Sequence, residues 1–177
     1  MLKPVTTFSI VARCPDTGQL GVAVSTADVG AGRMVAWARA GVGAVATLSW
    51  PNPYIGIDGL NLMSEGKPAP EVLAQLIAED PGRELRQAGI VDSQGRSDAW
   101  SGSGCTDWYG HVVGDGFAVQ GNMLVGSATV KAMAEAFTAS RGEELAERLL
   151  RAIEVGQAAG GDKRGRQCSG LLVVDRE

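Results

Sequence analysis

A cysteine and a histidine near the middle of the chain have a spacing that could form a catalytic pair. His111 is the only histidine in the sequence, and it follows Cys105 by six residues. A thiolate beside an imidazolium is a strong nucleophile, and Asp107 between the two residues could orient the ring. Spacing alone sets no geometry, so a strand histidine bonded to backbone is the competing interpretation. The pair therefore stands as one hypothesis, a thiol hydrolase.

An amide side chain is placed where acyl-transfer chemistry often needs one. Asn122 follows Gln120 and Gly121 at the point where an apolar segment ends and a helical pattern begins. A side-chain amide can donate a hydrogen bond to the oxyanion that forms when a carbonyl is attacked. Asparagine is also common at turns and helix entries, so both interpretations stay open.

A glycine-rich segment near the end of the sequence has the composition of an anion site. Residues 160–167 read GGDKRGRQ and include Asp162, Arg166 and Gln167. Backbone N–H groups in such a loop, together with arginines, can hold an anion. A solvated surface loop is the alternative. If the segment binds a ligand, a small molecule that carries a carboxylate is the expected partner.

The elements that must position these residues begin with a hairpin. Residues 6–14 alternate, with Phe8 and Ile10 on one face and Thr7 and Ser9 on the other. The Pro-Asp-Thr-Gly turn at residues 15–18 returns the chain as an apolar strand that ends near Ser25. Thr7 thus places a hydroxyl at the edge of the hairpin, although threonine is also an ordinary strand residue.

The rest of the chain alternates strands with pairs of helices. Further strands are predicted at residues 41–50, 87–92, 96–101, 109–113, 117–120 and 169–174, and residues 27–33 read as a loop. Four helices are expected: residues 59–65 capped by Asp58, a second from Pro70 to Asp80, a third carrying Val130, Met133 and Phe137, and a fourth opened by a capping box at residues 140–143. This order predicts an α+β fold in layers. Strands this apolar need cover, so a homo-oligomer is expected.

Composition excludes several classes of function. The chain has 177 residues, a net charge of −4 and 25 glycines, with aromatic residues at 5%. Its pI of about 5.1 gives no field that attracts nucleic acid, and its mean hydropathy is +0.03. No apolar stretch is long enough to predict a membrane span or a signal peptide. Three scattered cysteines and one histidine predict no zinc site, no cofactor and a reducing cytoplasm.

Several of these segments together resemble one known family. They are TFSIVAR, TGQLGVAV, WARAGVGAVAT, PGRELRQAGIVD, GHVVGDGFAVQGNML and GQAAGGDKRGRQ, spread from residue 7 to residue 167. In this order they are similar to the family catalogued as domain of unknown function 1028 (DUF1028). That family looks like the N-terminal-nucleophile (Ntn) hydrolase superfamily. The resemblance implies a four-layer αββα sandwich, and it predicts a single domain over residues 1–177 in which residues 1–6 are an extension.

The superfamily resemblance also implies a chemistry. Ntn hydrolases attack an amide with a Thr, Ser or Cys at the mature N-terminus, and the free α-amine of that residue is the base. Thr7 stands where the family pattern begins, so it is the expected nucleophile, with Asn122 at the oxyanion and Arg39 supplying positive charge. Six residues precede Thr7, and an acylated amine cannot be a base. The hypothesis therefore requires cleavage before Thr7; the alternative is a non-catalytic module that binds a small ligand or itself.

Overall fold

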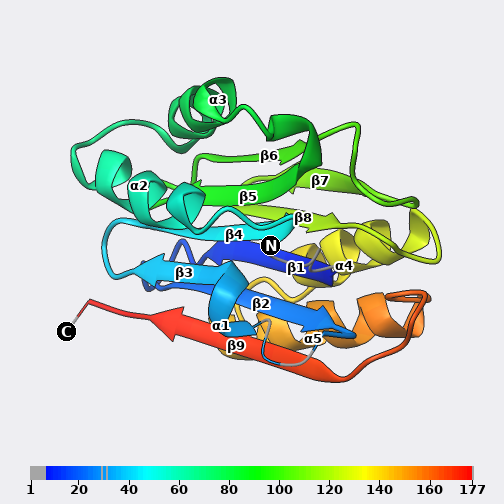
Figure 1. Ribbon diagram of the computed structural model, residues 1–177. Coiled ribbons are helices and arrows are strands. Elements are labelled where there is room, and N and C mark those ends of the chain that lie inside the picture. Colours follow the sequence, from blue (N-terminus) through cyan, green and yellow to red (C-terminus); the bar gives the residue numbers. More distant parts are fainter. Residues whose placement is uncertain (1–6, 29, 31, 177) are drawn as a thin grey trace.

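Two antiparallel sheets form the centre of the molecule. The computed structural model describes residues 7–28, 30 and 32–176 (Figure 1). The first sheet has the order β7 (Gly110–Gly114), β8 (Phe117–Gly121), β1 (Thr7–Arg13), β2 (Leu20–Thr26) and β9 (Cys168–Val174). The second has the order β3 (Ala36–Arg39), β4 (Gly43–Ser49), β5 (Arg86–Asp92) and β6 (Ser97–Ser101). The expected mixed fold of helices and antiparallel strands is confirmed at this level.

Helices lie against one face of each sheet. The first sheet carries α4 (Ala128–Ala139) and α5 (Leu145–Ala158), and the second carries α2 (Pro53–Ser64) and α3 (Ala69–Glu79) (Figure 1). A short helix α1 (Gly32–Val35) and a 3₁₀ turn η1 (Arg83–Leu85) complete the described elements. Residues 27–33, expected as a loop, therefore include the start of α1. None of the helices in the described part of the chain is long and apolar enough to cross a membrane.

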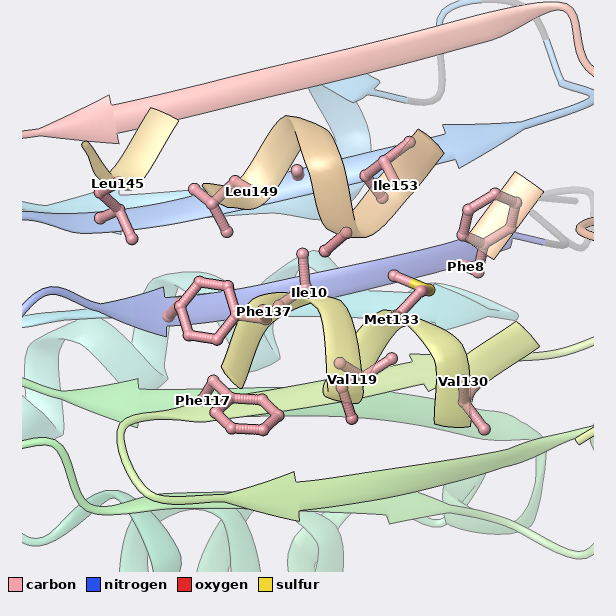
Figure 2. Packing of buried hydrophobic residues seen from close by; sticks show 14 of the residues in the cluster. Phe8, Ile10, Phe117, Val119, Val130, Met133, Phe137, Leu145, Leu149 and Ile153 are labelled. Atoms are coloured by element: carbon pink, nitrogen blue, oxygen red, sulfur yellow. The ribbon is translucent and has the colours of Figure 1, made fainter. Parts of the chain in front are cut away.

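The opening hairpin is confirmed, and its alternation sorts side chains between two environments. Thr7 pairs with Thr26, and Arg13 pairs with Leu20 across the turn. Phe8 and Ile10 enter the core beneath α4 and α5 (Figure 2). Val11 belongs instead to a cluster with β4 and β5 of the second sheet. Since side chains alternate along a strand, Thr7 and Ser9 share the face of Val11 and point between the sheets.

The two cores differ in the size of their side chains. Between the first sheet and its helices, large residues interlock: Phe117, Met133, Phe137, Leu149 and Ile153 (Figure 2). The buried Arg148 guanidinium lies 4.0 Å over the ring of Phe137. Between the sheets, the cluster has no aromatic residue and combines valines and Leu20 with the small residues Ala44, Ala46 and Ala118. Small side chains let the two sheets approach closely, so a polar side chain placed there loses contact with water.

Two helix starts differ from the sequence predictions. The helix expected at residues 59–65 begins at Pro53, because the Asn52 side chain accepts a hydrogen bond from the Tyr54 N–H and proline suits the first helical position. Asp58 is an exposed residue inside that helix and caps nothing. Ser140 does not open a capping box. It ends α4, where its hydroxyl donates to the carbonyl of Phe137, and α5 begins at Leu145.

A buried carboxylate ties the start of α2 to the second sheet. Asp80 accepts hydrogen bonds from Asn52, from the Gly82 N–H and from Arg86, whose Nε lies 2.8 Å away. Burial by itself would raise the pKa of Asp80. The hydrogen bonds from Arg86, Asn52 and Gly82 outweigh it and hold the pKa below its ordinary value.

Replacing this carboxylate by an amide is expected to lower stability in a pH-dependent way. Asp80→Asn should cost about 2 kcal/mol at pH 7, because the buried charge-assisted bonds to Arg86 are lost. A carboxyl whose pKa is lower in the folded state stabilises the fold above its unfolded pKa and loses that effect as pH falls. The difference should therefore shrink below about pH 4. Urea titrations at pH 7 and pH 3 measure it, with the exposed Asp58→Asn as the control; an equal cost at both values would contradict this account.

Candidate functional site

Thr7 and Asn122 are brought together by the strand register. Phe8 pairs with Gly121 at the end of β8, so the residues one step outward, Thr7 and Asn122, lie opposite each other. The N–H of Asn122 donates to the carbonyl of Thr7 over 3.0 Å. On its other side Thr7 pairs with Thr26. Opposite residues of an antiparallel pair have their side chains on the same face of the sheet. The structure therefore groups these three polar residues at one end of the space between the sheets.

Two oxygens of this group are buried without a hydrogen-bond partner. The side chains of Thr7 and Asn122 are fully buried, at 0% exposure. Within residues 7–28, 30 and 32–176, Thr7 Oγ1 and Asn122 Oδ1 both lack a hydrogen-bond partner. Buried polar atoms are nearly always bonded, because an unpaired one costs about 1–3 kcal/mol. Two such atoms on directly opposite residues make this end of the space between the sheets the candidate functional site.

Gln87 reaches this group from the second sheet. Its Oε1 accepts a hydrogen bond of 2.9 Å from Asn122 Nδ2. Its Nε2 donates to the carbonyl of Gly121 over 2.8 Å and to Ser101 Oγ over 2.9 Å, with the carbonyl of Gly110 at 3.3 Å. The side chain is 0% exposed. Gln87 is thus a polar bridge that fixes the second sheet to the end of β8.

The polar group continues towards the outer strands. Ser101 Oγ lies 3.0 Å from Nδ1 of His111 on the edge strand β7. One row further in, Gln120 donates to Ser9 over 2.6 Å. Gly89 faces Gln120, and a Cβ there would collide with its side-chain amide, so glycine makes room for it. We call the polar residues that lie between the sheets here the inter-sheet polar cluster: Thr7, Ser9, Thr26, Gln87, Ser101, His111, Gln120 and Asn122.

Cys105 and His111 are each bonded to other groups. The Cys105 thiol is buried and lies 3.4 Å from the carbonyl oxygen of Arg86. Burial raises the pKa of Cys105, which opposes thiolate formation. His111 bonds Ser101 instead, and burial lowers the pKa of its imidazole although Asp98 partly offsets this. The structure does not join the two residues as a nucleophile and its base.

Arg39 lies at the other end of the second sheet. It pairs with Gly43, whereas Gln87 pairs with Leu48, five residues further along β4. Five strand residues span roughly 17 Å. The Arg39 guanidinium donates to Asn61 Oδ1 on α2 over 3.1 Å. The structure therefore does not place Arg39 beside Thr7.

The residues predicted to form an anion site lie in two separate environments. Asp162 is buried and paired with Arg164 over 2.8 Å, and Arg164 also reaches Asp28 over 3.1 Å. The hydrogen bonds that the Arg164 guanidinium donates to Asp162 raise the pKa of Arg164 against the effect of burial. Arg166 and Gln167 instead line a groove of about 770 Å³ between α5 and β9. The Gln167 N–H donates to the carbonyl of Thr26. The groove is lined by Ser25 and α5, so it lies on the helix-covered face of the first sheet, opposite to the face on which the Thr7 side chain points between the sheets.

Metal ligation has no support in the described part of the chain. There, no group of three or more His, Cys, Asp or Glu side chains could hold a metal ion. The three cysteines are free thiols, two of them buried. The polar groups that converge are hydroxyls and amides, which suit hydrogen bonding to an organic group more than coordination of a cation.

Comparison with known proteins places the chain in a family. A family model described as "Family of unknown function (DUF1028)" matches residues 7–177. The chain belongs to this family. A solved DUF1028 structure, the protein SPO2555 from Silicibacter pomeroyi, is 30% identical and superposes with a TM-score of 0.89. The match covers 96% of this chain and 76% of that one. No functionally curated protein matches the sequence.

Several members of the inter-sheet polar cluster were missed from the sequence. Gln87, Ser101, Gln120 and Ser9 were not among the candidates, although all four lie on predicted strands. A signal does exist: Gln87, Gly89 and Val91 occupy one face of a strand whose other face carries Ala88 and Ile90. A glutamine at the end of such an apolar strand indicates a polar partner across the core.

Proposed function

We propose that the protein is an amide-bond hydrolase of the N-terminal-nucleophile type, with Thr7 as the nucleophile once the chain is cleaved before it. The observation that carries the proposal is the pair of unpartnered, fully buried oxygens on Thr7 and Asn122. The helix pair on the outer face of each sheet supports an αββα layer order, and with it this superfamily. Family membership alone assigns no activity.

Cleavage would use the Thr7 hydroxyl on the chain itself. Oγ1 attacks the carbonyl carbon of Thr6, the C–N bond to Thr7 breaks, and the hydroxyl proton passes to the amine. An ester joins residue 6 to Thr7 Oγ1, and water then hydrolyses it and releases residues 1–6. The products are a new carboxylate and a free α-amine on Thr7. An α-amine has a pKa near ~8, which suits a base at neutral pH.

Turnover repeats the same steps on an external amide. The Thr7 amine accepts the Oγ1 proton while Oγ1 attacks the substrate carbonyl. The second N–H of Asn122 Nδ2, the one not donated to Gln87, can stabilise the oxyanion. The leaving amine takes the proton, and water attacks the acyl-enzyme to regenerate the hydroxyl.

An activated ester tests this assignment without knowledge of the substrate. p-Nitrophenyl acetate should acylate Thr7 Oγ1, and the acetyl group should then move to the adjacent α-amine and remain there. Peptide mapping by mass spectrometry should find an acetylated N-terminal Thr7 peptide, absent when Thr7→Ala protein is treated identically. Acetylation confined to surface lysines in both proteins would contradict the proposal.

One observation favours a second candidate, a non-catalytic ligand-binding module. With residues 1–6 attached, the Thr7 side chain is fully buried and its amine is part of a peptide bond. A protein that stays uncut would keep the same fold and offer its groove between α5 and β9 for a small ligand. Ligand binding that is equal in wild type and in Thr7→Ala protein, with no acylation in either, would favour this candidate.

A further inference from the structure

Four side chains of the inter-sheet polar cluster form one continuous line of hydrogen bonds from the surface to the Thr7 site. His111 on the edge strand β7 contacts Ser101, and Ser101 contacts Gln87. Gln87 contacts Asn122. The line starts at a residue that water can reach and ends at a fully buried amide opposite Thr7.

The orientation of the Gln87 amide is fixed by its surroundings. Its Nε2 faces the carbonyl oxygens of Gly121 and Gly110, which can only accept hydrogen bonds. Exchanging Nε2 and Oε1 would set oxygen against oxygen. Oε1 must therefore accept from Asn122, which makes the bonded atom Nδ2 and leaves Oδ1 as the atom without a partner.

The direction of the remaining bonds follows from Ser101. Its hydroxyl oxygen already accepts from Gln87 Nε2. Its single hydrogen is then free to donate, and the other side-chain partner that the structure gives it is His111 Nδ1 at 3.0 Å. Nδ1 must be unprotonated to accept that hydrogen. Every donor in the line thus points outward, from Asn122 to His111.

We propose that His111 is a positioning residue for the Thr7 site. Its unprotonated Nδ1 accepts the last hydrogen bond of the line and so strengthens the bonds that hold the amide of Asn122 with Oδ1 left open. Because Thr7 lies opposite Asn122, this open acceptor can hold the α-amine that cleavage before Thr7 would free. That last step rests on the proposed function, whereas the line of hydrogen bonds does not. Hydrogen bonds that are aligned in a water-free interior strengthen one another. Loss of the acceptor on His111 therefore weakens the hydrogen bond of the Asn122 amide as well.

NMR spectroscopy tests the line in uncut Thr7→Val protein, where no result depends on cleavage. Since His111 is the only histidine, a long-range ¹H–¹⁵N spectrum of untagged protein shows a single imidazole. We expect the neutral form at pH 7 with the proton on Nε2. Ser101→Ala should raise the His111 pKa by about one unit, because a hydrogen bond to the neutral ring is lost. A proton on Nδ1, or an unchanged pKa, would overturn the proposal.

Hydrogen exchange of the buried side-chain amides with solvent reports whether His111 affects the hydrogen bonds of Gln87 and Asn122. His111→Leu should speed exchange of the side-chain N–H groups of Gln87 and Asn122 about tenfold. His111→Asn keeps an acceptor close to the Nδ1 position and should restore exchange to within about twofold. Val113→Leu, an exposed substitution on the same strand, is the control. Equal exchange in the leucine and asparagine variants would contradict the assignment.

The same variants with Thr7 intact separate this inference from the proposed function. If the wild type cleaves itself, His111→Leu should slow cleavage at least fivefold and His111→Asn should recover most of the rate. Equal cleavage rates in both variants would overturn the positioning role while the nucleophile stands. If the NMR spectra are as expected but the wild type never cleaves itself, the line of hydrogen bonds is supported and the proposed hydrolase function is refuted.

Discussion

Thr7→Val is expected to give a protein that is more stable than uncut wild type and has lost acyl transfer. Valine has nearly the shape of threonine but lacks the hydroxyl. In the folded protein that hydroxyl is fully buried and has no hydrogen-bond partner among the residues that the structure describes. Removing an unsatisfied buried polar atom should raise the free energy of unfolding by about 1 kcal/mol. Removing a nucleophile should lower acyl transfer at least ~10³-fold.

Urea denaturation of uncut wild-type and Thr7→Val protein gives the first quantity, and the p-nitrophenyl acetate reaction gives the second. Thr26→Val is the matched comparison, because Thr26 occupies the paired position on β2 and its hydroxyl accepts from the Asp28 N–H. That variant should lose stability. A Thr7→Val protein less stable than wild type would show that the Thr7 hydroxyl has a structural partner, and the account of a vacant nucleophile would fail.

Gln87→Leu is expected to be among the most destabilising substitutions between the sheets. The change leaves the carbonyl of Gly121, the hydroxyl of Ser101 and the amide of Asn122 each without a bond that they now have. Each orphaned group costs about 1 kcal/mol or more, so a loss of about 3–4 kcal/mol is expected. Since Asn122 also loses its fixed orientation, cleavage before Thr7 should slow with it.

Gln94→Leu makes the same chemical change on an exposed loop residue and should alter stability by no more than about 0.5 kcal/mol. Both proteins are compared by urea denaturation at pH 7. If Gln87→Leu proved as mild as Gln94→Leu, the hydrogen bonds of Gln87 would contribute nothing net and the inter-sheet polar cluster would not organise the site.

Most of the fold could be predicted from the sequence, but little of the inter-sheet polar cluster could, and the reason is physical. The β1–β2 hairpin, the apolar strand β4 and the amphipathic α4 are set by local alternation, periodicity and turn residues, which a sequence displays directly. The start of α2 was misplaced because Asp58 and Asn52 are both good caps, and only Asn52 precedes a proline at the first helical position.

The candidate site shows the same division. Thr7 and Asn122 were named from local context and prove to be neighbours, because each stands at the end of a strand in one sheet. Gln87 contacts Asn122 across 35 residues of sequence and from the other sheet. How two sheets stack depends on side-chain packing over the whole interface, which no single segment displays. For the same reason spacing along the sequence did not show where Arg39 lies relative to Thr7, or Cys105 relative to His111.

The most direct test of the central claim is the intact mass and N-terminal sequence of untagged protein made in its native host. The account predicts a chain that begins at Thr7 and lacks residues 1–6, while Thr7→Ala protein keeps them. A wild-type chain that still carries residues 1–6, unchanged after prolonged incubation at neutral pH and identical in processing to Thr7→Ala protein, would contradict it.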